Sequence, residues 1–188
     1  MARAKVILID ADVISHFFVN NCLEILHTIL SPHHLFIVDN VYNEATNPSL
    51  GTNRKETIDQ WIATNKIKRI PFPKSNPNIY KEFYRLKKEM PCLDEGERAC
   101  VAMARFGQET IASSNFRDIK EYCEEFGIEY IGSMDILNIA YRRGIMSETE
   151  CDQFIAEAKR INHARLPKDH IRDYTPTRNL DVFCIPIP

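Results

Sequence analysis

The sequence predicts a three-layer α/β fold, in which helices cover both faces of a central, mainly parallel β-sheet. Three observations favour this fold class. Short apolar runs of strand length alternate with longer helix-like segments along the chain. Two of these runs end abruptly in polar residues that favour the start of a helix. Finally, 188 residues, of which 44% are hydrophobic and 27% charged, have the size and composition of one globular domain.

Five short segments are the predicted strands. The first is a continuous apolar run that ends in Asp10, as expected for a strand that is buried on both faces. The second ends at Asp39, and the third precedes two prolines and is expected at an edge of the sheet. The five strands are expected at residues 6–9, 35–38, 67–70, 110–112 and 129–131.

Turn-forming residues delimit the predicted helices. Pro91 ends one of them, and Gly107, Gly127 and Gly144 end three others. A helix also begins at residues 39–40, after the second strand. The remaining helices are expected at residues 21–30, 54–64, 78–89, 95–106, 116–126, 134–143 and 147–161, followed by an irregular, proline-containing tail.

Composition excludes several classes of protein. The six cysteines form no CxxC pair, so we expect reduced thiols in the cytoplasm rather than disulfides or a zinc site. The sequence contains no apolar run of membrane-spanning length, and no signal-peptide pattern precedes the first strand. The net charge of −2 does not indicate nucleic-acid binding, but basic residues gather locally. Residues 159–178 contain six Lys or Arg against two acids.

Acidic residues follow the ends of the first two strands. Asp10 ends the first strand, and Asp12 lies two residues further on. Either could simply cap the following helix. Glu44 lies one turn into the helix that follows the second strand, where it could also be an ordinary exposed residue. Because ligands bind beyond the carboxyl ends of parallel strands, this edge of the sheet is the expected site.

Glu97 is the most informative acid. On a helical wheel it lies within the apolar arc of its helix, where an ionised carboxylate is costly unless it is compensated. A structural alternative is that Asp94 and Glu97 form a capping box at the start of this helix. A fourth polar cluster follows the strand at 110–112 and consists of Ser113, Ser114, Asn115 and Asp118. Carboxylates gathered at one place suit Mg²⁺ or Mn²⁺, which neutralises their repulsion.

The chain resembles PIN-domain proteins, and within them prokaryotic VapC-like toxins. Four short motifs carry the resemblance by their order and spacing: ILIDADV at residues 7–13, VYNE at 41–44, LDEGERACVAMA at 93–104 and IASSNFRD at 111–118. The resemblance covers residues 4–145. It implies a PIN-like nuclease domain over residues 1–145. Residues 146–188, a helix and an irregular tail, are expected to pack on the same domain.

The resemblance also implies a function and a site. The protein would be an endoribonuclease that uses Mg²⁺ or Mn²⁺ to hydrolyse RNA. Asp10, Glu44 and Glu97 would be its metal-binding acids, and Ser113 the small hydroxyl residue of the fourth motif. Asn115 stands where the family often has a fourth acid, so Asp118, one helical turn further on, is a second candidate ligand. VapC-like proteins are typically dimers paired with antitoxins, which implies a homodimer and an antitoxin partner here.

Two other functions remain open from the sequence. Asn115 is compatible with a catalytically degenerate PIN-like domain that binds RNA or protein without cleavage. Residues 8–13 also fit the opening motif of haloacid-dehalogenase phosphatases, in which Asp10 would be the nucleophile. That alternative makes no use of Glu44 or Glu97, and Asp135 alone is a poor substitute for its later paired acids.

Aromatic residues near two predicted helices are candidates for a dimer interface. Segments 21–30 and 54–61 could supply the surface, with Phe17, Phe18 and Trp61 at its buried centre. The structural alternative is that these three aromatic side chains belong to the core.

Overall fold

The computed structural model describes residues 4–184, apart from the side chains of Thr52 and Phe116. Its sheet contains β1 (Val6–Ile9), β2 (His34–Val38), β3 (Ile67–Ile70), β4 (Thr110–Ala112) and β5 (Tyr130–Ile131). All neighbouring strands are parallel, in the order β3-β2-β1-β4-β5. The predicted α/β class is confirmed, and β3 is an edge strand as expected.

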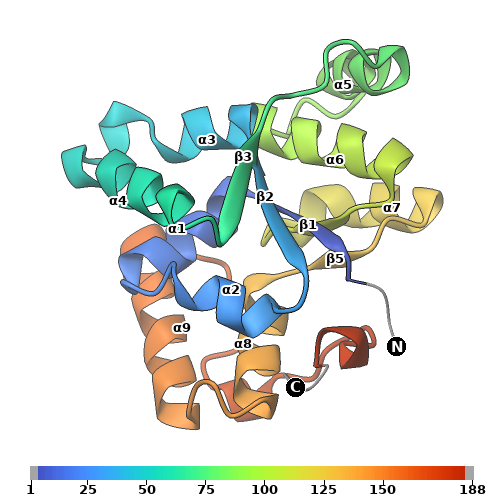
Figure 1. Ribbon diagram of the computed structural model, residues 1–188. Helices are drawn as coiled ribbons and strands as arrows, with labels where there is room; N and C mark the ends of the chain where they lie inside the picture. The colour runs from blue at the N-terminus through green and yellow to red at the C-terminus, as the bar shows by residue number, and fades with distance from the viewer. Residues whose placement is uncertain (1–3, 185–188) are drawn as a thin grey trace.

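Helices cover both faces of this sheet (Figure 1). In this view α2 (Ile25–Leu30), α8 (Ser133–Arg142) and α9 (Glu148–Asn162) lie below it. Above it lie α3 (Asp39–Ala45), α5 (Pro77–Glu89), α6 (Glu95–Gly107) and α7 (Phe116–Phe126). Two further helices, α1 (Ala11–Val19) and α4 (Thr52–Ala63), contact α9 and β3 respectively. Because helices pack on both faces, Ile7, Leu8 and Ile9 of β1 are completely buried.

The segment between β1 and β2 differs from the prediction. We expected one helix over residues 21–30, but α1 ends at Val19 and α2 begins only at Ile25. Asn21 lies between them with a φ of 52°, in the left-handed region, which interrupts the helical hydrogen bonding. The apolar residues on either side of this break pack into the core as two separate short helices.

The aromatic residues suggested for an interface are mostly core residues. Phe17 is completely buried and its ring lies 4.7 Å from that of Phe154, which joins α1 to α9. Trp61 is 1% exposed, and the half-buried Phe18 ring lies under the Arg54 guanidinium. Phe17 and Trp61 are therefore not available as the centre of a dimer interface, and the structural alternative is correct for both.

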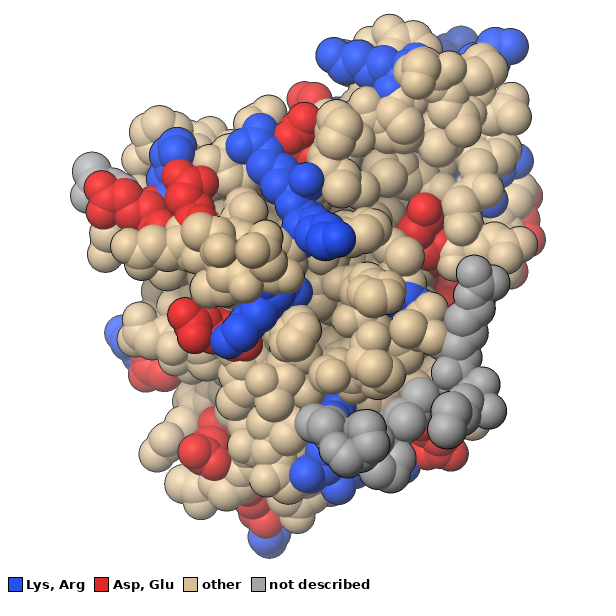
Figure 2. Space-filling view, in the orientation of Figure 1, with Lys and Arg blue, Asp and Glu red and all other residues tan. Residues whose placement is uncertain are grey.

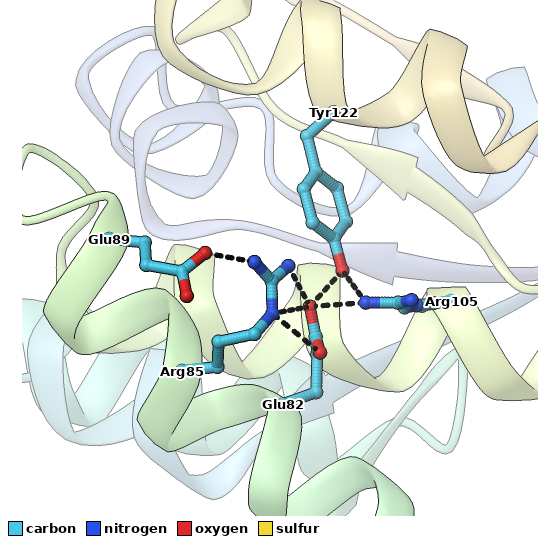
Figure 3. Close-up of polar contacts among 5 residues, drawn as sticks. All are labelled: Glu82, Arg85, Glu89, Arg105 and Tyr122. Carbon is cyan, nitrogen blue, oxygen red and sulfur yellow. Dashed lines mark hydrogen bonds and ion pairs between the residues drawn. The ribbon is translucent and has the colours of Figure 1, made fainter.

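A buried carboxylate joins α5 to α6 and α7 (Figure 3). The side chain of Glu82, on α5, is only 7% exposed and forms ion pairs with Arg85 at 2.6 Å and Arg105 of α6 at 2.7 Å. Tyr122 of α7 donates a hydrogen bond to the same carboxylate. Glu89 pairs with the outer side of Arg85. These contacts hold α5 against the helices that lead to and from β4.

The two edges of the sheet carry basic side chains. Lys68 and Arg69 of β3 are exposed, and Figure 2 shows Lys and Arg side chains over the part of this face where Figure 1 draws β3. At the other edge, the guanidinium of Arg178 donates to the carbonyl oxygen of Tyr130 in β5. Among the described residues, no helix is both long and apolar enough to cross a bilayer.

Candidate metal centre

Asp10 lies at the middle of the carboxyl edge because β1 is the central strand. Its backbone N–H donates to the carbonyl oxygen of Ala112 in β4 at 2.9 Å, which fixes the chain as it leaves the sheet. One carboxylate oxygen accepts from the N–H of Ala11 at 2.8 Å, so Asp10 does cap α1. Only 1% of the residue is exposed. Capping uses one oxygen, and the carboxylate keeps further acceptor capacity for a ligand.

Glu97 lies in the first turn of α6, where the predicted capping box is present. Asp94 accepts a hydrogen bond from the N–H of Glu97 at 2.7 Å, and Oε2 of Glu97 accepts one from the N–H of Asp94 at 3.2 Å. The second oxygen, Oε1, is buried and has no hydrogen-bond partner among the described residues. A buried carboxylate oxygen without a partner is costly unless a cation or water occupies the space beside it. The capping role and a ligand role are thus compatible in Glu97.

Asp12 completes the acidic group. One carboxylate oxygen from each of Asp10, Asp12 and Glu97 lies within 4.8 Å of the other two, so a single ion could contact all three. Asp10 and Glu97 are buried, whereas Asp12 is exposed and opens the group to solvent. From the sequence alone, Asp12 is expected only as a helix cap. The signal that could have identified it is its position two residues beyond Asp10, at the first turn of a helix that begins at the sheet edge.

Glu44 lies beside this group but is not one of its three members. It comes from α3 and is half-buried against the start of α6. A Cβ at Gly96 would lie 2.8 Å from Oε2 of Glu44 and 3.1 Å from Cγ2 of Val41, so only glycine allows α3 to approach this closely. The backbone N–H of Gly96 lowers the pKa of Glu44, whereas burial and the neighbouring Asp94 raise it, to about 8 overall.

The acids destabilise one another's charged forms. Burial raises the pKa of Asp10 well above its ordinary value, and Glu97 and Asp12 raise it further. Burial and Asp94 raise the pKa of Glu97 to about 7. A divalent cation would remove this penalty by neutralising the carboxylates, and oxygen ligands of this kind suit Mg²⁺ or Mn²⁺. The donor set and the unpartnered Glu97 oxygen therefore both fit such an ion.

The fourth motif lies partly against this group and partly away from it. Asn115 is the N-cap residue of α7, but its side chain does not cap the helix. Instead it lies near enough to Glu97 to lower the pKa of that acid, although no hydrogen bond of ordinary geometry joins them. Ser113 is buried and its hydroxyl accepts from the N–H of Asn115 at 3.2 Å, which shapes the turn. Asp118 is not brought into the acidic group and lines a neighbouring cavity.

A buried hydroxyl chain supports the loop that carries Asn115. Nδ1 of His16, in α1, lies 2.9 Å from the hydroxyl of Ser133 at the start of α8. That hydroxyl lies 2.7 Å from the one of Ser114, which follows β4. Burial lowers the pKa of His16 to about 4, so the imidazole is neutral near pH 7. This hydroxyl chain could not be predicted from the sequence, since His16 and Ser133 are 117 positions apart.

Comparison with known proteins supports one of the interpretations left open by the sequence. A family model described as a PIN domain matches residues 6–174. No curated protein matches the chain significantly. The acid expected of a phosphatase after β5 has a structural role instead. Asp135 is completely buried and accepts hydrogen bonds from the N–H of Gly132 at 2.9 Å and the hydroxyl of Tyr174 at 2.7 Å.

Proposed function

Because the chain belongs to the PIN-domain family, we propose that it is an endoribonuclease that requires Mg²⁺ or Mn²⁺. The observation that carries the proposal is the group formed by Asp10, Asp12 and Glu97, with its unpartnered buried oxygen. Family membership alone would not distinguish an active site from a degenerate one. The group supplies oxygen ligands from a strand end and two helix starts, which hold them in place before any ion binds.

These residues would have different roles in such a site. Asp10, Asp12 and Glu97 would hold the ion, and Asn115 would orient Glu97 and face the substrate. Glu44 lies beside the group, and its carboxyl, with a pKa of about 8, would add negative charge there once a bound cation lowers that pKa. When bound, the ion supplies Lewis-acid polarisation of a phosphodiester and lowers the pKa of a coordinated water. The exposed carboxylate of Asp12 lies on the solvent side, from which a phosphodiester could approach.

Replacement of Glu97 by glutamine tests the proposal. The amide oxygen can still accept from the N–H of Asp94, so helix α6 keeps its capping box. We expect Glu97→Gln to abolish metal-dependent RNA cleavage while its melting temperature in metal-free buffer stays the same or rises, because one repelling charge is lost. Glu56→Gln, at an exposed position on α4, is the matched control and should cleave RNA normally. Cleavage that persists in Glu97→Gln would contradict the proposal.

We propose in addition that this nuclease is the toxin of a toxin–antitoxin pair. The support is the resemblance of its four motifs to those of VapC-like proteins. Expression of the chain alone should then arrest bacterial growth, and Glu97→Gln should relieve the arrest. Harmless expression, together with undetectable RNA cleavage in Mn²⁺, would contradict this proposal. It would favour the alternative of a degenerate binding domain, for which the observation is the amide of Asn115 in place of a fourth acid.

A further inference from the structure

A cavity of about 800 Å³ opens beside the acidic group. Its inner wall is formed by Ser114 and Asn115 before α7 and by Gly132 and Ser133 at the start of α8. The outer wall is the segment that follows α9, from Arg165 to Arg178. Asn115 therefore lines the cavity and also lies next to Glu97. Asn115 thus links the cavity to the proposed metal centre.

The outer wall is fixed to the rest of the molecule at several points. Ile171, in the short helix η2 (Ile171–Asp173), is 1% exposed, and its N–H donates to Asp152 of α9 at 2.8 Å. Tyr174 donates to the buried Asp135, and the guanidinium of Arg178 lies 3.8 Å from the centre of the Tyr130 ring. Because these contacts are made within the chain itself, they hold the wall in place, and a ligand would not have to order it.

The charge of this cavity is mainly positive. Arg117 on α7, and Arg165 and Lys168 on the outer wall, are exposed and form no ion pair or side-chain hydrogen bond with described residues. By contrast, the nearby basic residues Lys159 and Arg172 are paired with acids. Two acids, Asp118 and Asp173, also line the cavity, against four basic residues in total. Cations left without protein partners around one cavity suit an anionic ligand with several charges.

We propose that this cavity binds the sugar-phosphate backbone of single-stranded RNA next to the scissile bond. Arg117, Arg165 and Lys168 would contact phosphates. The inference rests on the proposed nuclease function and adds the surface, and the residues on it, that hold the substrate. A cavity of this volume is in the range of small-ligand pockets, which suits the unstacked nucleotides of one strand better than a stiff duplex. The N–H groups at the start of α7, which lack a side-chain cap, would add donors.

Binding of labelled RNA to an inactive protein tests the inference separately from cleavage. All variants are made in Glu97→Gln, and the probe is a fluorescein-labelled single-stranded oligoribonucleotide. The test pair is Arg165→Gln with Lys168→Gln. The control pair is Lys87→Gln with Lys88→Gln, which removes the same charge from exposed positions on α5. Melting temperatures establish that each protein is folded.

We expect the test pair, but not the control pair, to change the salt dependence of binding. Loss of two phosphate contacts should reduce the slope of log affinity against log salt by about 1.4. If the test pair and its parent bind equally at 1 M salt, this change corresponds to roughly 25-fold weaker binding by the test pair at 0.1 M salt. Arg117→Gln, on a different element, should reduce the slope by about 0.7. The same sequence as a duplex should bind more weakly than the single strand.

Three results would overturn the inference: equal effects of the test and control pairs, an unchanged slope in the test pair, or equal binding of the duplex. The nuclease proposal fails separately. If the wild type does not cleave RNA but binding depends on Arg165 and Lys168, the cavity is a binding site and only the proposed activity is lost. If the wild type cleaves and both pairs bind alike, only the present inference is lost.

Discussion

Glu97 forms the capping box and is also free to take the proposed ligand role, although the sequence presented these as alternatives. Its backbone N–H and Oε2 belong to the capping box with Asp94, whereas Oε1 is buried without a partner. In the proposed site the two oxygens of this carboxylate would have different partners, the helix start for Oε2 and the ion for Oε1. A helix start is a suitable place for a ligand because the cap fixes the side chain and the N-terminal dipole stabilises its charge.

Asn115 is the residue at which the site departs most from the PIN pattern. Asn115→Asp would add a negative charge beside Glu97, so we expect Mn²⁺ to bind at least about tenfold more tightly. The added repulsion should also lower the melting temperature of the metal-free protein. Isothermal titration calorimetry with Mn²⁺ measures the first effect. Asp118→Asn provides the comparison, because weaker Mn²⁺ binding in that variant, with unchanged binding in Asn115→Asp, would assign the fourth ligand to Asp118.

At the scale of helices and strands, the fold was largely predictable because the strands other than β3 are short, mainly apolar runs. Buried parallel strands have this signature, and Pro or Gly marks most helix ends. The break at Asn21 was not predictable, because the apolar pattern continues on both sides of it and only the backbone conformation differs. The membership of Asp12 in the acidic group was missed for another reason. Its apposition to Glu97 depends on how α1 and α6 meet in space.

The buried contact between α5, α6 and α7 gives a prediction about stability. Burial raises the pKa of Glu82, but hydrogen bonds from Arg85, Tyr122 and Arg105 lower it more, to about 2. Glu82→Gln should lower the free energy of unfolding by about 2–3 kcal/mol, since two arginines lose their buried partner. Glu89→Gln, at a side chain that is 52% exposed, should cost less than about 0.5 kcal/mol. Urea denaturation at neutral pH measures the unfolding free energy of both variants. Equal losses would contradict the distinction between the buried Glu82 and the exposed Glu89.

The chain from His16 to Ser133 and Ser114 gives a prediction about pH. Burial alone lowers the pKa of His16 from 6.5 to about 4, so the unfolded chain takes up a proton at higher pH than the folded one. The stabilisation by neutral His16 is therefore complete above pH 6.5 and is lost as pH falls toward 4. Its full size is on the order of 3 kcal/mol.

His16→Gln isolates this contribution, because glutamine can hydrogen-bond to Ser133 but does not titrate. As the pH falls from 7 to 4, the wild type should lose about 2–3 kcal/mol of unfolding free energy relative to His16→Gln. Using the difference cancels the contributions of the acidic group, which both proteins share. A difference that is independent of pH would show that His16 is not held neutral by the fold.

For the whole molecule, self-association remains a proposal that rests on the resemblance to VapC-like proteins. Since Phe17 and Trp61 are core residues, an interface would have to use other side chains. Tyr80 and Tyr84 on α5, and Tyr141 and Ile161 on the opposite side of the sheet, are large apolar residues that are exposed. Light scattering at micromolar concentration should give the mass of a dimer, about twice 21.8 kDa. A monomer mass would contradict the proposal.

The basic edges of the sheet limit how two copies could meet. On β3, exposed Lys68 and Arg69 would be brought against their own equivalents if two chains joined these edges, and like charges in adjacent strands repel. On β5, the side chain of Arg178 already donates a hydrogen bond to the carbonyl oxygen of Tyr130, and the strand is only two residues long. Neither edge can therefore act as a template for a further strand. Fibre growth by continuous sheet is therefore disfavoured, and we expect any assembly to form through surfaces other than these edges.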